Sequence, residues 1–256
     1  MKGPIWEGVY ASFAEVPVTG PGFAGDTWIT RGQEKLAALR EAAQSASDQH
    51  APGQPGYAEG LLPVVAALTL AREGSVRILD FGGGLGFAYY PLLSTLPDSA
   101  RVQFQIVEGQ AVCRAGRESF ASVPQVSFHE SLGPELAGPD IAHFGSSLHY
   151  IEDWRGLLTT ICALGPEALL LTDLPAGDIP TYASAQEYYG SKLPVWFFNL
   201  SEVTEVLRGQ GYALRLRCAH MAPRLGKVQP LPQDNFEPHH RVGHTCTLLC
   251  TREDAP

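Results

Sequence analysis

This chain of 256 residues is poor in positive charge and has neither a long hydrophobic run nor a closely spaced cysteine pair. Its 18 Lys and Arg residues stand against 27 Asp and Glu residues, which gives a net charge of -9 and an isoelectric point near 5.3. Such a balance argues against a nucleic-acid backbone as the main partner. The longest uncharged apolar stretch, 61–71, contains Pro63 and is far shorter than the roughly 20 residues that span a bilayer. We therefore expect no nucleic-acid partner and no membrane partner.

The cysteines and the N-terminus indicate a reducing compartment. The five cysteines are an odd number without a C-x-x-C pair, so reduced thiols are their expected state. The first residues do not show the charged region, apolar region and cleavage site of a secretory signal, and we expect a cytoplasmic protein. No carboxylate or cysteine has a spacing that would complete a specific metal site with His239, His240 and His244, so no metal is expected.

The first part of the chain differs in composition from the rest. In residues 1–56 an aromatic segment and a glycine-rich stretch precede a helix near 31–47 that opens with a capping-box pattern. We expect an N-terminal aromatic and helical extension that docks on a main domain of residues 57–256 and can act as a lid. A second helix is expected over 57–72.

From residue 75 onward, short apolar runs alternate with helical patterns, which favours βα units and a doubly wound, mostly parallel sheet. The expected strands lie near 75–80, 102–107, 125–129, 139–145, 167–172, 212–219 and 243–251, with helices between the first six, the last of them at 201–210. The connection 220–242 is long and rich in proline and polar residues, so the final strand is expected to return antiparallel to its neighbour.

The most informative segment is the turn that follows the first of these strands, Asp80-Phe81-Gly82-Gly83-Gly84-Leu85-Gly86. Glycines remove side chains where a backbone must turn sharply and approach a ligand. The dinucleotide fingerprint G-x-G-x-x-G fails here, because its last position falls on Phe87 or Tyr89. The remaining pattern, D-x-G-x-G-x-G, resembles motif I of the class I S-adenosylmethionine-dependent methyltransferases. The alternative is a tight strand-to-helix turn in a non-catalytic α/β protein.

This resemblance implies the cofactor S-adenosylmethionine, the product S-adenosylhomocysteine and a Rossmann-like sheet of seven strands with an antiparallel last strand. It implies that the glycine turn passes under the methionine and ribose parts of the cofactor; the matching glycines are Gly82, Gly83, Gly84 and Gly86. Asp80 would contact the amino-acid moiety. An ammonium and a sulfonium favour a nearby carboxylate, which agrees with that role.

The resemblance also implies roles for residues at the later strand ends. Glu108 would accept hydrogen bonds from both ribose hydroxyls, for which a carboxylate offers two oxygens; helix capping or simple solvation is the alternative. Glu130 and Ser131 occupy the stretch that recognises adenine, although Ser131 can instead be a helix N-cap. Ser146, Ser147, His149 and Tyr150 follow the fourth strand, where methyl donor and acceptor would meet.

If the acceptor must lose a proton, His149, Asp173 and Tyr189 are the candidate bases, although a histidine at this place often only packs beside the cofactor. The long loop after the fifth strand carries aromatic residues that either line an acceptor pocket or plug the core: Tyr182, Tyr188, Tyr189, Trp196 and Phe197. Near the N-terminus, Tyr10 or Trp6 would touch the cofactor if the extension is a lid, and packing without ligand contact is equally open.

A narrower resemblance rests on Trp6-Glu7-Gly8-Val9-Tyr10, Phe13, Gly22-Phe23 and Trp28 together with the glycine turn. This combination resembles an uncharacterised family of bacterial methyltransferases, sometimes associated with surface-polysaccharide biosynthesis. We expect methyl transfer to an oxygen or nitrogen of a small-molecule acceptor, with a sugar or glycan precursor as one idea. A non-catalytic cofactor-binding or scaffold protein is the alternative, and the glycine spacing disfavours a nicotinamide-dependent oxidoreductase. The oligomeric state is not predicted.

Overall fold

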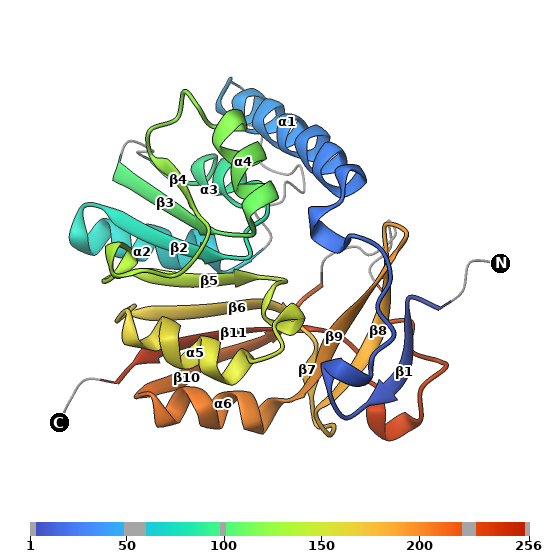
Figure 1. Ribbon diagram of the computed structural model, residues 1–256. Coiled ribbons are helices and arrows are strands. Elements are labelled where there is room, and N and C mark those ends of the chain that lie inside the picture. Colours follow the sequence, from blue (N-terminus) through green and yellow to red (C-terminus); the bar gives the residue numbers. More distant parts are fainter. Residues whose placement is uncertain (1–3, 49–59, 98–100, 222–228, 254–256) are drawn as a thin grey trace.

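The computed structural model describes residues 4–48, 60–97, 101–221 and 229–253. Its main sheet has seven strands in the order β10-β11-β6-β5-β2-β3-β4 (Figure 1). These are β2 (Val76–Phe81), β3 (Val102–Val107), β4 (Val126–His129), β5 (Ile141–Gly145), β6 (Ala168–Leu174), β10 (Tyr212–Ala219) and β11 (Cys246–Arg252). Strand β11 runs antiparallel to both of its neighbours, and the other pairs are parallel. The predicted α/β class, Rossmann-like seven-stranded sheet and antiparallel last strand are confirmed.

Strand β2 lies at the centre of this sheet because its apolar residues can be buried on both faces. Ile78 and Leu79 are fully buried, and β3 and β5 pair with the strand on either side. The register places Asp80 opposite Ile106 of β3 and opposite His143 of β5. The carboxyl ends of these three strands therefore meet at one edge of the sheet.

Helices cover both faces of the sheet, as Figure 1 shows. The helices are α1 (Asp26–Asp48), α2 (Leu62–Glu73), α3 (Tyr89–Leu93), α4 (Gln110–Ser119), α5 (Trp154–Ala163) and α6 (Leu200–Gly209). Helices α1 to α4 pack in one hydrophobic cluster with Ile78 and Ile106, and α5 and α6 pack in a second with Leu79 and Phe144. Within the described ranges, no helix is both long and apolar enough to cross a membrane.

Two of the predicted helices need correction. Helix α1 begins at Asp26 instead of near residue 31, because the carbonyl of Gly25 already accepts backbone hydrogen bonds from Trp28 and Ile29. Between β4 and β5 the prediction of a helix is wrong. That connection contains only the single turn η4 (Pro134–Leu136), since glycine and proline interrupt any longer helix there. The first residues of the predicted helix 57–72 lie outside the described residues.

A second, smaller sheet replaces the long loop that the sequence predicted after β6. Its order is β1-β8-β9-β7, with β1 (Trp6–Tyr10), β7 (Ala176–Gly177), β8 (Tyr182–Tyr188) and β9 (Ser191–Asn199). Strands β8 and β9 form a hairpin whose two-residue turn, Tyr189-Gly190, has positive φ angles of 51° and 80°. Two positive φ angles are typical of the type I′ turn that suits the twist of a hairpin. The N-terminal strand β1 joins this hairpin, whereas the expected division at residue 56 stays a prediction.

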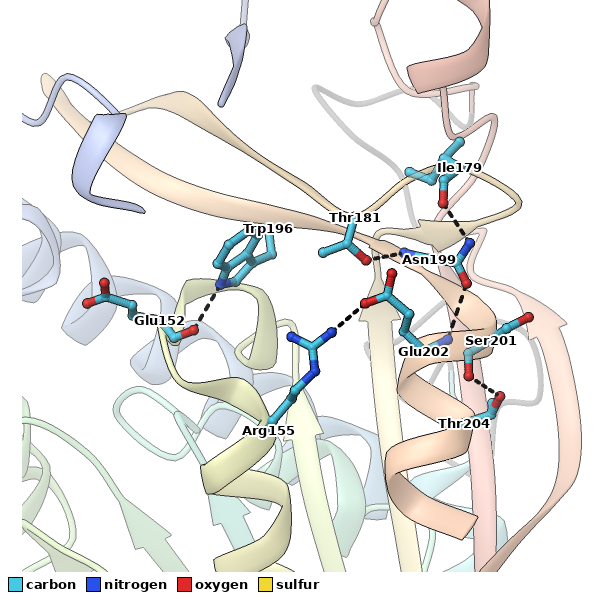
Figure 2. A network of polar contacts seen from close by, with 9 residues as sticks. All are labelled: Glu152, Arg155, Ile179, Thr181, Trp196, Asn199, Ser201, Glu202 and Thr204. Carbon is cyan, nitrogen blue, oxygen red and sulfur yellow. Dashed lines mark hydrogen bonds and ion pairs between the residues drawn. The ribbon is translucent and has the colours of Figure 1, made fainter. Parts of the chain in front are cut away.

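Polar contacts fasten the hairpin to the main domain (Figure 2). The backbone N–H of Asn199 donates to Thr181, and its side chain donates to the Ile179 carbonyl while accepting from the N–H of Glu202 at the start of α6. The indole N–H of Trp196 donates to the Glu152 carbonyl at 3.2 Å. The hairpin is thus held at the same end of the molecule as the carboxyl ends of the parallel strands.

Candidate functional site

A cavity of about 950 Å³ lies at the carboxyl ends of the parallel strands. It is lined by ten of the residues that the sequence predicted for the site: Asp80, Gly82, Gly83, Gly84, Glu108, Glu130, Ser131, Ser146, Ser147 and Asp173. These residues lie at or just after the ends of β2, β3, β4, β5 and β6, so the topology brings together positions that are nearly a hundred residues apart. Ligands of open α/β sheets bind at this edge.

The glycine turn is shaped by the protein's own neighbours. Gly82 and Gly84 have φ angles of 67° and 60°, which L side chains rarely adopt. A Cβ atom on Gly82 would lie 2.4 Å from the Cβ of Ser147, and one on Gly83 would lie 2.3 Å from Oδ2 of Asp80. The turn is therefore closely packed against both side chains, in addition to facing the cavity.

The carboxylate of Glu108 is held by backbone donors at the edge of this turn. Gly84 N–H donates to Oε1 and Gly109 N–H donates to Oε2, each at 3.0 Å. Burial raises the pKa of Glu108 above its ordinary value of 4.5, and the two backbone hydrogen bonds oppose this shift. Each oxygen keeps a further lone-pair site, so the carboxylate can accept two hydroxyl donors from the cavity.

Asp80 forms a buried pair with His143, a residue that the sequence reasoning missed. Nδ1 of His143 lies 2.8 Å from Oδ1 of Asp80, and the two side chains are 7% and 1% exposed. Both residues line the cavity. The available signal was a histidine within the otherwise apolar strand β5, at the register position opposite the motif acid.

The segment after β5 is tied to the neighbouring strands. Ser147 donates to the carbonyl of Phe81 at 2.6 Å, which fixes the loop beside the glycine turn. Ser146 and Asp173 both have positive φ angles, 61° and 55°, and Ser146 donates to Oδ2 of Asp173 at 2.8 Å. Thr245, directly before β11, donates to Oδ1 of Asp173 at 2.6 Å. Such unusual backbone angles cluster at functional sites.

Four predicted residues do not line the large cavity. His149 is buried beside Tyr150, with ring centroids 4.3 Å apart, and both line a small cavity of about 30 Å³ that Ser146 and Asp173 also border. Tyr189 sits in the hairpin turn and is 48% exposed. Tyr10 packs beside the cluster formed by Phe13, Val16, Ala183 and Ala185, and Gly86 packs under Phe120 and Ile106. The roles of these four stay predictions.

The cavity lining includes four aromatic side chains that we call the aromatic wall: Phe23, Trp28, Tyr150 and Tyr188. The sequence placed Tyr150 where methyl donor and acceptor would meet and left Tyr188 undecided, whereas Phe23 and Trp28 were given no role at the site. Trp28 donates its indole N–H to the hydroxyl of Tyr188 at 3.3 Å, which joins α1 to the hairpin. If the extension is a lid, Trp6 or Tyr10 was expected to touch the cofactor, whereas the residues of the N-terminal extension that line the large cavity are Phe23, Trp28 and Lys35. Nearby, Glu130 pairs with Arg117 at 3.1 Å.

Comparisons with known proteins place this fold. No family model matches the chain, so the narrower family resemblance stays a prediction. The chain is 25% identical over 203 residues to a tRNA (adenine(58)-N(1))-methyltransferase of Thermus thermophilus, covering 77% of this chain and 69% of that protein.

Solved structures give the same picture at the level of the fold. An S-adenosylmethionine-dependent methyltransferase from Mesorhizobium loti matches with a TM-score of 0.51 and 16% identity over 78% of this chain and all of that one. Magnesium protoporphyrin IX methyltransferase from Synechocystis PCC 6803, with bound S-adenosylhomocysteine, matches with a TM-score of 0.50 and 12% identity, covering 87% and 99%. The chain therefore has the class I methyltransferase fold.

Proposed function

We propose that this protein binds S-adenosylmethionine and transfers its methyl group to an oxygen or nitrogen of a small-molecule acceptor. The observation that carries the proposal is the carboxylate of Glu108, oriented by Gly84 and Gly109 at the rim of a cavity in a class I methyltransferase fold. A pocket of about 950 Å³ is within the range of roughly 300–1,000 Å³ of small-molecule sites.

The residues present fit the cofactor. Glu108 would hold the ribose hydroxyls, Asp80 the amino-acid moiety, and Glu130 or Ser131 the adenine. When bound, the cofactor supplies the methyl group, which forms a bond to the acceptor's lone pair as the carbon–sulfur bond breaks and leaves a neutral thioether. Asp173 would take the proton that the acceptor loses, with its carboxylate oriented by Ser146 and Thr245. The enclosing walls would exclude water and align acceptor with methyl group.

The candidate acceptors are a small molecule and an RNA. An RNA acceptor is the second candidate, favoured by the likeness to the Thermus tRNA methyltransferase. The net charge of -9 weighs against it, because RNA binding depends on neutralising phosphates with Lys and Arg. A sugar or glycan precursor belongs to the small-molecule class. A non-catalytic binding protein remains the alternative if no acceptor is turned over.

Calorimetric titration of the purified protein with S-adenosylhomocysteine and, separately, with NAD tests the proposal. We expect one site for S-adenosylhomocysteine and no measurable binding of NAD. Binding of NAD alone would contradict the proposal and favour a nucleotide-dependent oxidoreductase. A transfer assay with an isotopically labelled methyl donor then separates the acceptors. Labelled tRNA would indicate an RNA methyltransferase, and a labelled small molecule would indicate the proposed function. The absence of any labelled product would indicate a non-catalytic binding protein.

A further inference from the structure

The aromatic wall is a preorganised surface on the acceptor side of the cavity. Its centre is Phe23, whose ring contacts Trp28 at 5.7 Å, Tyr150 at 4.9 Å and Tyr188 at 5.5 Å between centroids. The first two of these contacts are mutual edge-to-face, with interplanar angles of 82° and 80°, and the third is tilted at 60°. Rings that brace one another in this way keep their orientation without a ligand. The wall can therefore receive a flat apolar face at little entropic cost.

Polar groups beside the wall supply one donor and one acceptor. Gln186 of β8 is 9% exposed, and its amide oxygen accepts the hydroxyl of Tyr150 at 2.8 Å. Because the amide oxygen of Gln186 accepts this bond, the NH2 group is the part of the side chain that can donate to a ligand in the cavity. The carboxylate of Asp173 is an acceptor lining the same cavity. A ligand that meets both groups needs a proton donor for Asp173 and an acceptor atom for Gln186.

The charge of the cavity selects against anionic ligands. Its described lining includes four carboxylates, Asp80, Glu108, Glu130 and Asp173, and a single Lys or Arg, Lys35. The ammonium of Lys35 lies over the ring of Phe87 at 4.4 Å from its centroid. A phosphate or carboxylate would enter a field dominated by like charge, whereas a neutral or cationic ligand would not.

From these three observations we infer that the methyl acceptor is a neutral or cationic planar ring compound carrying a hydroxyl or amino group. This inference rests on the proposed function. The ring lies against the aromatic wall, the hydroxyl or amino group donates to Asp173, and a neighbouring oxygen or ring nitrogen accepts from Gln186. The proton lost on methylation passes to Asp173 and from there to solvent, while the methyl group replaces it on the acceptor.

The test measures binding of small probes to the protein saturated with S-adenosylhomocysteine. The planar probes are catechol, 2-aminophenol and 3-hydroxypyridine; the comparison probes are cis-1,2-cyclohexanediol, methyl glucoside and glucose 1-phosphate. We expect at least one planar probe to bind about tenfold or more tightly than cyclohexanediol and to be methylated when S-adenosylmethionine replaces the product. The inference is overturned if none does so, or if the glucoside or the sugar phosphate binds as tightly as the best planar probe.

Two matched variants locate the binding surface. Phe23→Leu removes the central ring but keeps an apolar side chain, and Phe13→Leu makes the same change in the N-terminal segment at a ring that stacks on Trp196. Phe23→Leu is expected to weaken the planar probe by about 2- to 12-fold, the value of one aromatic contact, without changing affinity for S-adenosylhomocysteine. Phe13→Leu is expected to change neither.

Equal effects of the two substitutions on the probe would overturn the role of the wall. The titration with S-adenosylhomocysteine separates failure of the inferred acceptor class from failure of the proposed function. Intact S-adenosylhomocysteine binding with failure of all planar probes rejects the acceptor class alone, whereas failure to bind S-adenosylhomocysteine rejects the proposed function itself.

Discussion

Replacing Glu108 by alanine isolates the contact that the proposed cofactor site depends on most. The carboxylate is already positioned by two backbone N–H groups at 3.0 Å, so it needs little reorganisation to receive the ribose hydroxyls. A hydrogen bond to a charged group contributes about 1.5–3 kcal/mol. Both ribose hydroxyls lose their bond to Glu108, but water that enters the variant site would replace part of this interaction. We therefore expect a total loss of about 1.5–3 kcal/mol in binding free energy, or about a 10- to 150-fold increase in the Kd for S-adenosylhomocysteine.

The assay must separate lost ligand contacts from a disturbed glycine turn. Glu108→Ala leaves the N–H groups of Gly84 and Gly109 without their carboxylate, whereas Glu108→Gln keeps an oxygen for one of them. Thermal unfolding without ligand therefore accompanies each titration, and Glu187→Ala, an exposed carboxylate paired with Lys192, serves as the matched control. If Glu108→Ala is as stable as the control and binds S-adenosylhomocysteine with unchanged affinity, the assignment of the ribose to Glu108 is refuted.

Four further outcomes are expected. Burial raises the pKa of Glu108 above 4.5 in the free protein, and ribose hydroxyls favour its ionised form. The affinity for S-adenosylhomocysteine, measured by calorimetry, should therefore fall as pH is lowered through that raised pKa. Glu108→Gln should lack this pH dependence. The same raised pKa means that the group stabilises the ligand-free fold at low pH and that this contribution is lost as pH rises, which the pH dependence of urea unfolding would show relative to Glu108→Gln.

Gly84→Ala should abolish binding of S-adenosylhomocysteine, because the added Cβ would lie 2.5 Å from the ring of Phe87 and Gly84 has a positive φ. Gly209→Ala, whose Cβ would meet no neighbour, should leave binding unchanged. Equal binding by both variants would place the ligand elsewhere. Asp173→Asn should lower kcat by about 10²- to 10⁴-fold with little change in cofactor Kd, and an unchanged kcat would remove Asp173 from the proton transfer.

The main sheet could be predicted from the sequence because its central strands are buried on both faces. In β6 a continuous apolar run ends at Thr172, and in β2 only Arg77 interrupts the apolar residues before Asp80. Such short, mostly apolar runs favour a central parallel strand. Once the strand order is that of a doubly wound sheet, Asp80, Glu108 and Asp173 must fall at one edge. Their assembly around a cavity follows from strand ends alone, without knowledge of any side-chain contact.

The second sheet escaped prediction for a physical reason. Strand β8 is buried over Tyr182 to Gln186 with no simple alternation of polar and apolar residues, and its turn is Tyr189-Gly190 instead of the common Asn-Gly or Asp-Gly. The pairing partner β1 is distant in sequence, so no local signal reveals it. The aromatic wall depends on that pairing, because Phe23 and Tyr188 meet only after the N-terminal segment has docked on the hairpin.

The pair of Asp80 and His143 illustrates the same limit on a smaller scale. Each residue lies at a strand end that the sequence predicts, but their contact depends on the register of β2 against β5. Register depends on both strands, so it cannot be predicted from the sequence of either strand alone. Side-chain partners of the motif acid were therefore out of reach of the sequence pattern, although the acid itself was not.

A crystal structure of the protein with S-adenosylhomocysteine tests the central claim most directly. We predict electron density in the cavity beside the glycine turn, with both ribose hydroxyls within hydrogen-bond distance of Glu108 and the sulfur directed toward Ser146 and Asp173. Density at another place, such as the cavity of about 590 Å³ beside Leu68 and Arg72, or a ribose turned away from Glu108, would contradict it.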